Sequence, residues 1–210
     1  MANERPETQV VAADLTPPSI KVPSNLTIVE SNAEEDWPFQ QRFTFIHARM
    51  LTSAIHDWPA LLQRCWDFLQ PGGWLELLEV VSPYRSEIPT ADNPSSPFIK
   101  WGYAADEGWA SEGLDWTTTS KHVQRLTSLG FMNIHEAQMR WPLGEWADTE
   151  VEQRIGAMTL QNFAGFFSTT AQKIITKNPN LDKDEAEILT RNAYNDLVSN
   201  CATNRYFLMV

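Results

Sequence analysis

Apolar and polar positions along the chain predict strands separated by helices. Three short apolar or β-branched runs predict strands at residues 9–14, 25–30 and 42–47. Residues 57–69 repeat apolar side chains at helical spacing, and the Asp57 carboxylate suits the N-cap of that helix. The expected buried stripe of this helix consists of Trp58, Leu61, Leu62, Cys65, Trp66 and Leu69. After Pro71-Gly72-Gly73 the chain becomes almost continuously apolar at residues 74–81, which is typical of a strand covered on both faces. This alternation indicates an α/β fold with a mostly parallel sheet.

The second half of the chain carries longer and more aromatic helical segments. Residues 82–97 hold four prolines and no periodicity, which predicts a long loop. Helices are then expected at residues 98–114, from Thr119 or Ser120 to a left-handed end at Gly130, at 149–176, and from Asp182 onward, where Asp182 and Glu185 resemble a capping box. Two further strands are predicted at residues 131–141 and 205–210.

Composition and charge narrow the classes of partner. The 210 residues include 27 acidic and 16 basic side chains, a net charge of −11. Nucleic acids and anionic membrane surfaces bind clustered Lys and Arg, so neither is expected as a partner. Two cysteines are too few for a disulfide framework. The polar N-terminus and the absence of an apolar run of about 20 residues favour a soluble protein of the cytoplasm.

Three segments carry a family resemblance. They are Phe45–Leu51 (FIHARML), Asp57–Trp58 (DW) and Leu69–Glu76 (LQPGGWLE). Together they resemble the fungal LaeA-like class I methyltransferases, in which a strand ending in IHAR-L is followed by an I-DWP-L helix start and an LKPGGWLELQE turn. The resemblance implies a three-layer, Rossmann-like α/β methyltransferase fold. Residues 1–210 are then expected to form a single domain, with helical cap segments at about 94–116 and 149–200.

The same resemblance assigns cofactor positions and exposes a departure. It places Asp14 where an acidic residue binds the ribose of S-adenosylmethionine, and Asn32 near the adenine; the alternative for Asp14 is an N-cap or turn residue. In the family a central strand and a glycine-rich turn precede the Asp14 strand, whereas here no glycine precedes Gly72. We therefore expect a truncated domain without its first central strand, with Asp14 and Asn32 as vestigial cofactor contacts and no tight S-adenosylmethionine binding.

A missing central strand leaves two rows of backbone donors and acceptors to be satisfied. Each buried unpaired group costs about 1–3 kcal/mol. The remaining strands must close the gap, another segment must fill it, or a second chain must cover it as a homodimer.

Candidate site residues lie at the expected carboxyl ends of the strands, where open α/β sheets bind ligands. His47, Arg49 and Glu79 are the candidate polar or catalytic groups, although Arg49 could instead pair with the acidic turn at residues 34–36. Five aromatic residues between Phe98 and Trp116 exceed what a short cap needs, and they suit the wall of a cavity for an apolar small molecule. The proposed substrate-binding set is Trp101, Tyr103, Trp109, Phe163, Phe166 and Phe167, with ordinary core packing as the alternative for about half of them.

Three functions follow as alternatives. The favoured one is a non-methylating enzyme of fungal natural-product biosynthesis, a cofactor-independent cyclase or pericyclase of the Diels–Alder type, because a shaped cavity with a few polar groups suffices for that chemistry. The others are an S-adenosylmethionine-dependent methyltransferase and a non-catalytic, LaeA-like regulatory module. No His/Cys cluster has metal-ligand spacing, so no metal is expected.

Overall fold

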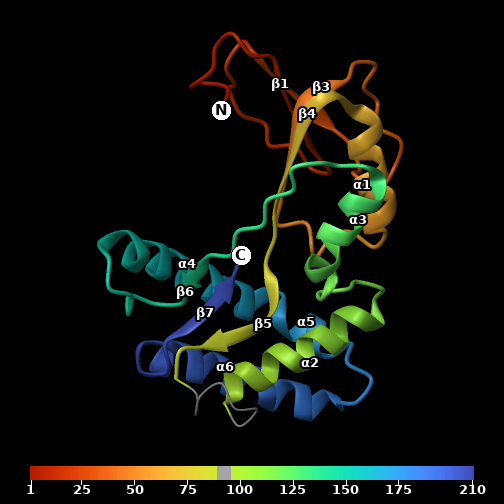
Figure 1. Cartoon of the computed structure of the whole chain (residues 1–210). Coiled ribbons are helices and arrows are strands. Elements are labelled where there is room, and N and C mark those ends of the chain that lie inside the picture. Colours follow the sequence, from red (N-terminus) through yellow and green to blue (C-terminus); the bar gives the residue numbers. More distant parts are fainter. Residues whose placement is uncertain (89–95) are drawn as a thin grey trace. The chain divides into compact units, whose positions relative to one another are not determined.

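The computed structural model describes residues 1–88 and 96–210, which divide into two compact units (Figure 1). Unit 1 comprises residues 1–46 and 57–76, and unit 2 comprises residues 47–56 and 77–210. The boundary between them runs through strands β3 (Phe43–Arg49) and β4 (Leu69–Leu78). In the part of the chain that is described, no helix is long and apolar enough to cross a membrane.

Unit 1 begins with a parallel strand pair. Strand β1 (Val10–Asp14) runs beside β2 (Leu26–Glu30), with Val10 opposite Leu26 and Asp14 opposite Glu30. The buried Asn25 side chain donates to the carbonyls of Ala2, Arg5 and Thr8 at 2.8–3.0 Å, which ties the N-terminal segment to the start of β2. Both strands lie where the sequence predicts them.

Helix α1 (Trp58–Phe68) also belongs to unit 1, together with the first part of β3 and most of β4, which pair with each other. Asp57 caps the helix as predicted, because its carboxylate accepts a hydrogen bond from the Ala60 amide at 2.9 Å. The expected stripe is buried at Trp58, Leu61, Leu62, Cys65 and Leu69. The inclusion of Trp66 is wrong, since that side chain is 40% exposed.

Strands β1 to β4 do not form one continuous sheet. Among the described strands, β1–β2 and β3–β4 form two separate two-stranded sheets. The remaining strands therefore do not close the gap, and its filling by another segment or by a second chain stays a prediction.

Unit 2 contains a three-stranded antiparallel sheet in the order β5-β7-β6. Its strands are β5 (Val81–Ser86), β6 (Arg140–Pro142) and β7 (Tyr206–Met209). The helices of unit 2 are α2 (Pro97–Ser111), the 3-10 helix η1 (Thr118–Lys121), α3 (His122–Leu129), α4 (Glu150–Thr169), α5 (Ala171–Ile175) and α6 (Lys183–Asn204). The central strand β7 is the C-terminal one, as Figure 1 shows in blue.

Several predicted boundaries in unit 2 are wrong. The sheet here is antiparallel, not parallel, and residues 82–86 of the expected loop belong to β5, which pairs with β7. The rest of that loop includes residues 89–95, which lie outside the described residues. The strand expected at 131–141 shrinks to Arg140–Pro142, because pairing with the C-terminal strand begins only at Met139. The expected 149–176 helix is interrupted at Thr170, whose backbone φ of −110° departs from the helical value.

Other local predictions for unit 2 are confirmed. Gly130 ends α3 in the left-handed region at a φ of 100°, which glycine adopts without steric cost. Asp182 and Glu185 form a complete capping box at the start of α6.

The core of unit 2 is dense and aromatic. Phe98 and Trp101 on α2 are fully buried, together with Tyr206 on β7. A buried carboxylate lies within this core: Asp196 accepts hydrogen bonds from the Tyr206 hydroxyl at 2.6 Å and the Ser96 hydroxyl at 3.0 Å. Because its partners satisfy it, the polar group is compatible with an apolar surrounding.

Candidate functional site

The first candidate site is the edge at which β1 and β2 end. Their carboxyl ends meet because the strands are parallel, and the Ser31 amide donates to the Asp14 carbonyl at 3.0 Å. The Asp14 side chain is exposed, and its Oδ1 accepts a hydrogen bond from the Thr16 amide at 2.9 Å. This geometry leaves the other carboxylate oxygen of Asp14 to a ligand with hydroxyl donors.

Asn32 follows directly after β2 at the same edge. Its Oδ1 accepts from the Glu34 amide at 3.0 Å, and its Nδ2 donates to the Glu35 carboxylate at 3.1 Å. Glu34 in turn accepts from the Asp57 amide at 3.0 Å, which anchors the turn on the start of α1. Asp14 and Asn32 therefore lie at one edge, as the resemblance implies, and a ligand that uses the Asn32 side chain must replace the Glu35 contact.

His47 and Arg49 lie in the last part of β3. They are two residues apart, so they project from the same face of the strand. Both side chains are exposed. The strand ends at Met50, whose amide donates to the Leu78 carbonyl at 2.9 Å and whose φ is 58°. Their roles as catalytic or polar groups stay predictions.

Glu79 is buried directly after β4, where it holds the segment that follows β3. Its carboxylate accepts hydrogen bonds from the Leu51 amide at 2.8 Å, the Thr52 amide at 2.9 Å and the Thr52 hydroxyl at 2.7 Å. Burial raises the pKa of Glu79, and the hydrogen bonds from Thr52 and Leu51 oppose that rise. The structure thus gives Glu79 an anchoring role, while its contact with a ligand stays a prediction.

Two of the six aromatic candidates, Trp101 and Phe167, belong to the buried core of unit 2. Trp101 is 0% exposed, packs against Phe167 with 4.8 Å between ring centroids and 48° between ring planes, and donates its indole N–H to Thr190 at 3.3 Å. Phe163 and Phe166 are partly buried against the same core. Core packing, the alternative that the sequence left open, describes Trp101 and Phe167.

Tyr103 and Trp109 are the more accessible aromatic candidates on α2. Tyr103 is 47% exposed. Trp109 is half-buried and stacks on Trp116, with 5.6 Å between ring centroids and 20° between ring planes. These two side chains remain open to a ligand without disruption of the core.

A further carboxylate on α2, Asp106, is not among the site residues predicted from the sequence. It accepts a hydrogen bond from the Ser82 hydroxyl of β5. Burial raises the pKa of Asp106 to about 6, against the opposing effect of the Ser82 hydrogen bond. A signal for it exists in the sequence, since Asp106 is a charged residue between Gly102 and Trp109 on an otherwise apolar helix face.

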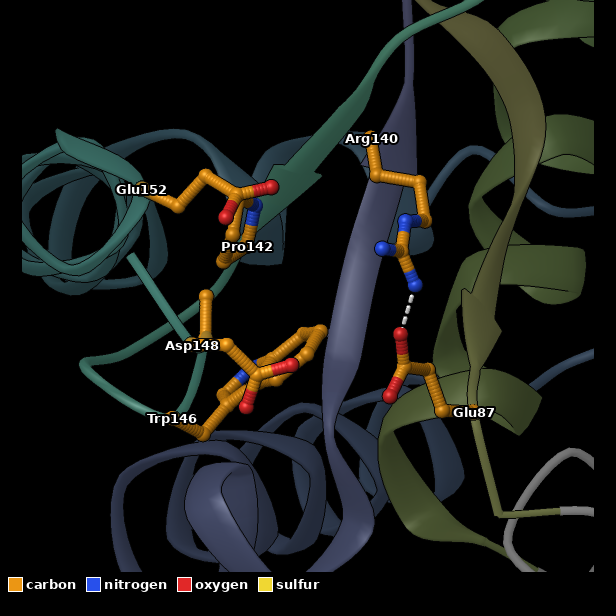
Figure 2. A pocket seen from close by; sticks show the side chains of 7 residues that line it. Glu87, Arg140, Pro142, Trp146, Asp148 and Glu152 are labelled. Atoms are coloured by element: carbon orange, nitrogen blue, oxygen red, sulfur yellow. Dashed lines mark hydrogen bonds and ion pairs between the residues drawn. The ribbon is translucent and has the colours of Figure 1, made fainter. Parts of the chain in front are cut away.

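Unit 2 also contains an open hollow, shown in Figure 2. Arg140 and Glu87 point toward each other across it and form an ion pair, and Arg205 binds the other Glu87 oxygen at 3.1 Å. Its lining residues are Glu87, Arg140, Pro142, Trp146, Ala147, Asp148 and Glu152. The Glu87 and Arg140 charges in this hollow are therefore already paired within the protein. Across the described ranges, no group of three or more His, Cys, Asp or Glu side chains could hold a metal ion.

Comparison with known proteins identifies the family of the chain. A family model described as "Methyltransferase domain" matches residues 1–136, which is more than half of the chain. The chain belongs to the methyltransferase domain family. It is accordingly an α/β protein with the Rossmann-like methyltransferase fold, and the LaeA-like resemblance is confirmed by the relatives described next.

Three relatives show the range of this methyltransferase family. The chain is 27% identical over 200 residues to the probable methyltransferase tdiE of Emericella nidulans, covering 94% of this chain and 62% of tdiE. It is 26% identical over 193 residues to the methyltransferase pytC of Aspergillus terreus, covering 91% and 59%. It is 31% identical over 142 residues to the secondary metabolism regulator LAE1 of Cochliobolus heterostrophus, covering 65% and 45%. The chain thus spans about three fifths of the length of the two methyltransferases.

Proposed function

We propose that the chain acts on small molecules in fungal secondary metabolism as a methyltransferase-type enzyme, with the β1–β2 edge on its cofactor side. Membership of the methyltransferase domain family supports the type of enzyme, and the relatives tdiE, pytC and LAE1 support the fungal context. The observation that carries the proposal is the exposed Asp14 carboxylate at the carboxyl end of a parallel strand, beside Asn32.

S-adenosylmethionine fits this edge chemically. The free oxygen of Asp14 would accept hydrogen bonds from ribose hydroxyls, and the amide of Asn32 would lie on the adenine side. When bound, the cofactor supplies an electrophilic methyl group. The residues of the chain then have to orient a substrate, exclude water and accept a proton from the group that becomes methylated.

The test is calorimetric titration of the 210-residue chain with S-adenosylmethionine. Asp14→Asn keeps the shape of the side chain but removes its charge, while Glu30→Gln at the end of β2 serves as the matched control. Hydrogen bonds to charged groups contribute about 1.5–3 kcal/mol, which corresponds to a loss of roughly 10- to 100-fold in affinity for Asp14→Asn. Equal binding by all three proteins, or no binding by the parent, would overturn the cofactor proposal.

A cofactor-independent cyclase is the second candidate. It is supported by the accessible aromatic side chains of Tyr103 and Trp109 on α2, which suit a cavity for an apolar small molecule. Product analysis with 1,3,8-nonatriene, which can close by intramolecular cycloaddition, tests this candidate. Accelerated ring closure by a chain that does not bind S-adenosylmethionine would replace the methyltransferase proposal. If neither activity occurs, the regulatory role suggested by the relative LAE1 becomes the proposal to pursue.

A further inference from the structure

A carboxylate, a hydroxyl and two indole rings occur together beside α2, outside the residues discussed as catalytic. The Ser82 hydroxyl of β5 donates to Asp106. Trp109 lies three residues after Asp106, and residues at this spacing are neighbours on a helix surface. Strand β5 and helix α2, both labelled in Figure 1, belong to unit 2. Their contact therefore does not depend on how the two units are placed relative to each other.

The turn that follows α2 brings the Trp116 ring onto the Trp109 ring. The Leu114 amide donates to the Trp109 carbonyl at 3.0 Å, and Gly113 takes a φ of +84°, which favours glycine. The rings of Trp109 and Trp116 then stack at 5.6 Å, both half-buried. The Cβ atoms of Asp106 and Trp109 are expected about 5–6 Å apart, the usual spacing of neighbouring residues on a helix surface.

The hydrogen bonding of these groups is incomplete. The indole Nε1 of Trp116 is buried and has no acceptor within the described residues. An unsatisfied buried donor is unfavourable, so an acceptor supplied by a ligand would be stabilised there. Asp106 has no basic partner in the described part of the chain, whereas the nearby Asp115 binds Lys121 at 2.6 Å and Glu112 binds Lys177 at 3.0 Å.

These properties specify the ligand. Asp106 requires a donor, the Trp116 indole requires an acceptor, and the stacked rings favour a flat apolar body. A simple ammonium ligand would satisfy Asp106, but it has no acceptor for the Trp116 N–H. A flat aromatic compound that carries both a hydroxyl and a carbonyl group satisfies all three.

We propose that Ser82, Asp106, Trp109 and Trp116 form a substrate subsite for hydroxyl- and carbonyl-bearing aromatic molecules, in which Asp106 accepts the hydrogen bond of the substrate hydroxyl. The proposal deepens the small-molecule function proposed above and rests on it. The elevated pKa of Asp106, caused by burial, makes its ionised form a stronger proton acceptor than an ordinary exposed carboxylate.

The subsite is tested by binding, without any cofactor. The probe is 6-hydroxy-2-acetonaphthone, whose hydroxyl and carbonyl groups are too far apart to bond to each other, titrated by calorimetry at neutral pH, and 2-acetonaphthone serves as the same molecule without the hydroxyl. Asp106→Asn removes the charged acceptor, and Trp116→Phe removes the indole donor while keeping a ring. Glu112→Gln, a carboxylate at the end of the same helix, and Trp74→Phe, an exposed tryptophan in unit 1, are the matched controls.

We expect the parent to bind the hydroxylated probe at least tenfold more tightly than 2-acetonaphthone. Asp106→Asn should abolish that preference, and Trp116→Phe should weaken both probes by about fivefold to tenfold, as for loss of one hydrogen bond. The control variants should match the parent. Absence of probe binding by the parent, or an unchanged hydroxyl preference in Asp106→Asn, would show that the assignment is wrong.

The outcome separates this proposal from the one on which it rests. If S-adenosylmethionine binds at Asp14 but the probe does not bind, the substrate subsite is wrong and the methyltransferase-type function stands. If the probe binds with the expected hydroxyl preference and the cofactor does not, the subsite stands and the cofactor side of the proposed function is wrong. Circular dichroism and two-dimensional NMR spectra of each variant confirm that the fold is retained.

Discussion

The two units satisfy their backbone and bury their side chains in different ways. In unit 2 the central strand β7 pairs on both sides, and Phe98, Trp101 and Tyr206 are fully buried. In unit 1 the strands occur as two separate pairs, and Trp74 on β4 is 58% exposed. Unit 1 does have an aromatic cluster, but its members are only half-buried: Trp37, Phe39, Phe43 and Phe68. Its fully buried side chains lie instead on α1, at Trp58, Leu61, Leu62 and Cys65.

The difference shows that the large buried core and the proposed cofactor edge lie in different units. Unit 2 contains a large core of its own, so its fold needs no additional strand. Unit 1 contributes the Asp14 edge, which we propose as the cofactor side, while its strand pairs leave edges to be satisfied. Local stability generally follows buried apolar contacts and protected hydrogen bonds, so unit 1 is expected to open at lower free energy than unit 2.

Truncation of a tryptophan in each unit provides the largest contrast. Trp101→Ala removes a fully buried ring from the core of unit 2 and should lower the free energy of unfolding by about 3–5 kcal/mol. Trp74→Ala removes an exposed ring from unit 1 and should change it by at most about 0.5 kcal/mol. Urea unfolding followed by circular dichroism measures both, and a comparable loss in the two variants would contradict the proposed contrast.

Removal of the Glu79 carboxylate should have the next largest effect. Glu79→Ala leaves the Leu51 and Thr52 amides without their acceptor, which should cost about 2–4 kcal/mol of unfolding free energy. The partner variant Thr52→Val removes only the hydroxyl donor and should cost about 1 kcal/mol. If Glu79 instead serves mainly a ligand, its replacement will leave stability unchanged, and the double variant will show no coupling between the two positions.

Sequence patterns were sufficient where a local rule determines the structure. Asp57 at the start of α1 and Gly130 at the end of α3 follow from capping chemistry that involves only nearby residues. The extent of β5 and β6 depends instead on pairing with the C-terminal strand β7, more than 60 residues away from either, which no local window contains.

The candidate site was predictable to a similar degree. The positions of Asp14 and Asn32 at one edge followed from parallel strands and the family resemblance. The environment of Asp106 did not, because its raised pKa depends on burial and on Ser82, which lies 24 residues earlier in the chain. Trp101 also looked like a potential cavity wall in sequence, whereas only tertiary packing places it in the core.

Asp106 gives a smaller effect, which depends on pH. Burial raises its pKa from 3.8 to about 6, so the folded state favours the protonated form. The corresponding stabilisation is fully present below the unfolded pKa and is lost as the pH rises through about 6. Asp106→Asn imitates the neutral form, so it should be more stable than the parent by about 1–3 kcal/mol at pH 7.5 and nearly equal to it at pH 4. Urea unfolding of both proteins across this range measures the difference, and a gap that does not vary with pH would refute the assignment.

The smallest expected effect compares one type of interaction in both units. Asp57→Ala removes the cap of α1 in unit 1, and Asp182→Ala removes the capping box of α6 in unit 2, each at a cost of about 1 kcal/mol. The magnitudes should be similar, but the amides that lose protection should differ. In unit 2 helix α6 packs into the same core as the other elements of the unit. The loss of Asp182 should therefore lower hydrogen-exchange protection throughout unit 2. In unit 1 the loss of the Asp57 carboxylate should affect mainly α1, because the backbone amide of Asp57 that donates to Glu34 is retained in Asp57→Ala. Hydrogen exchange resolved by residue tests this point, and if Asp57→Ala lowers protection uniformly over both units, they unfold as one cooperative body and the comparison drawn between them does not hold.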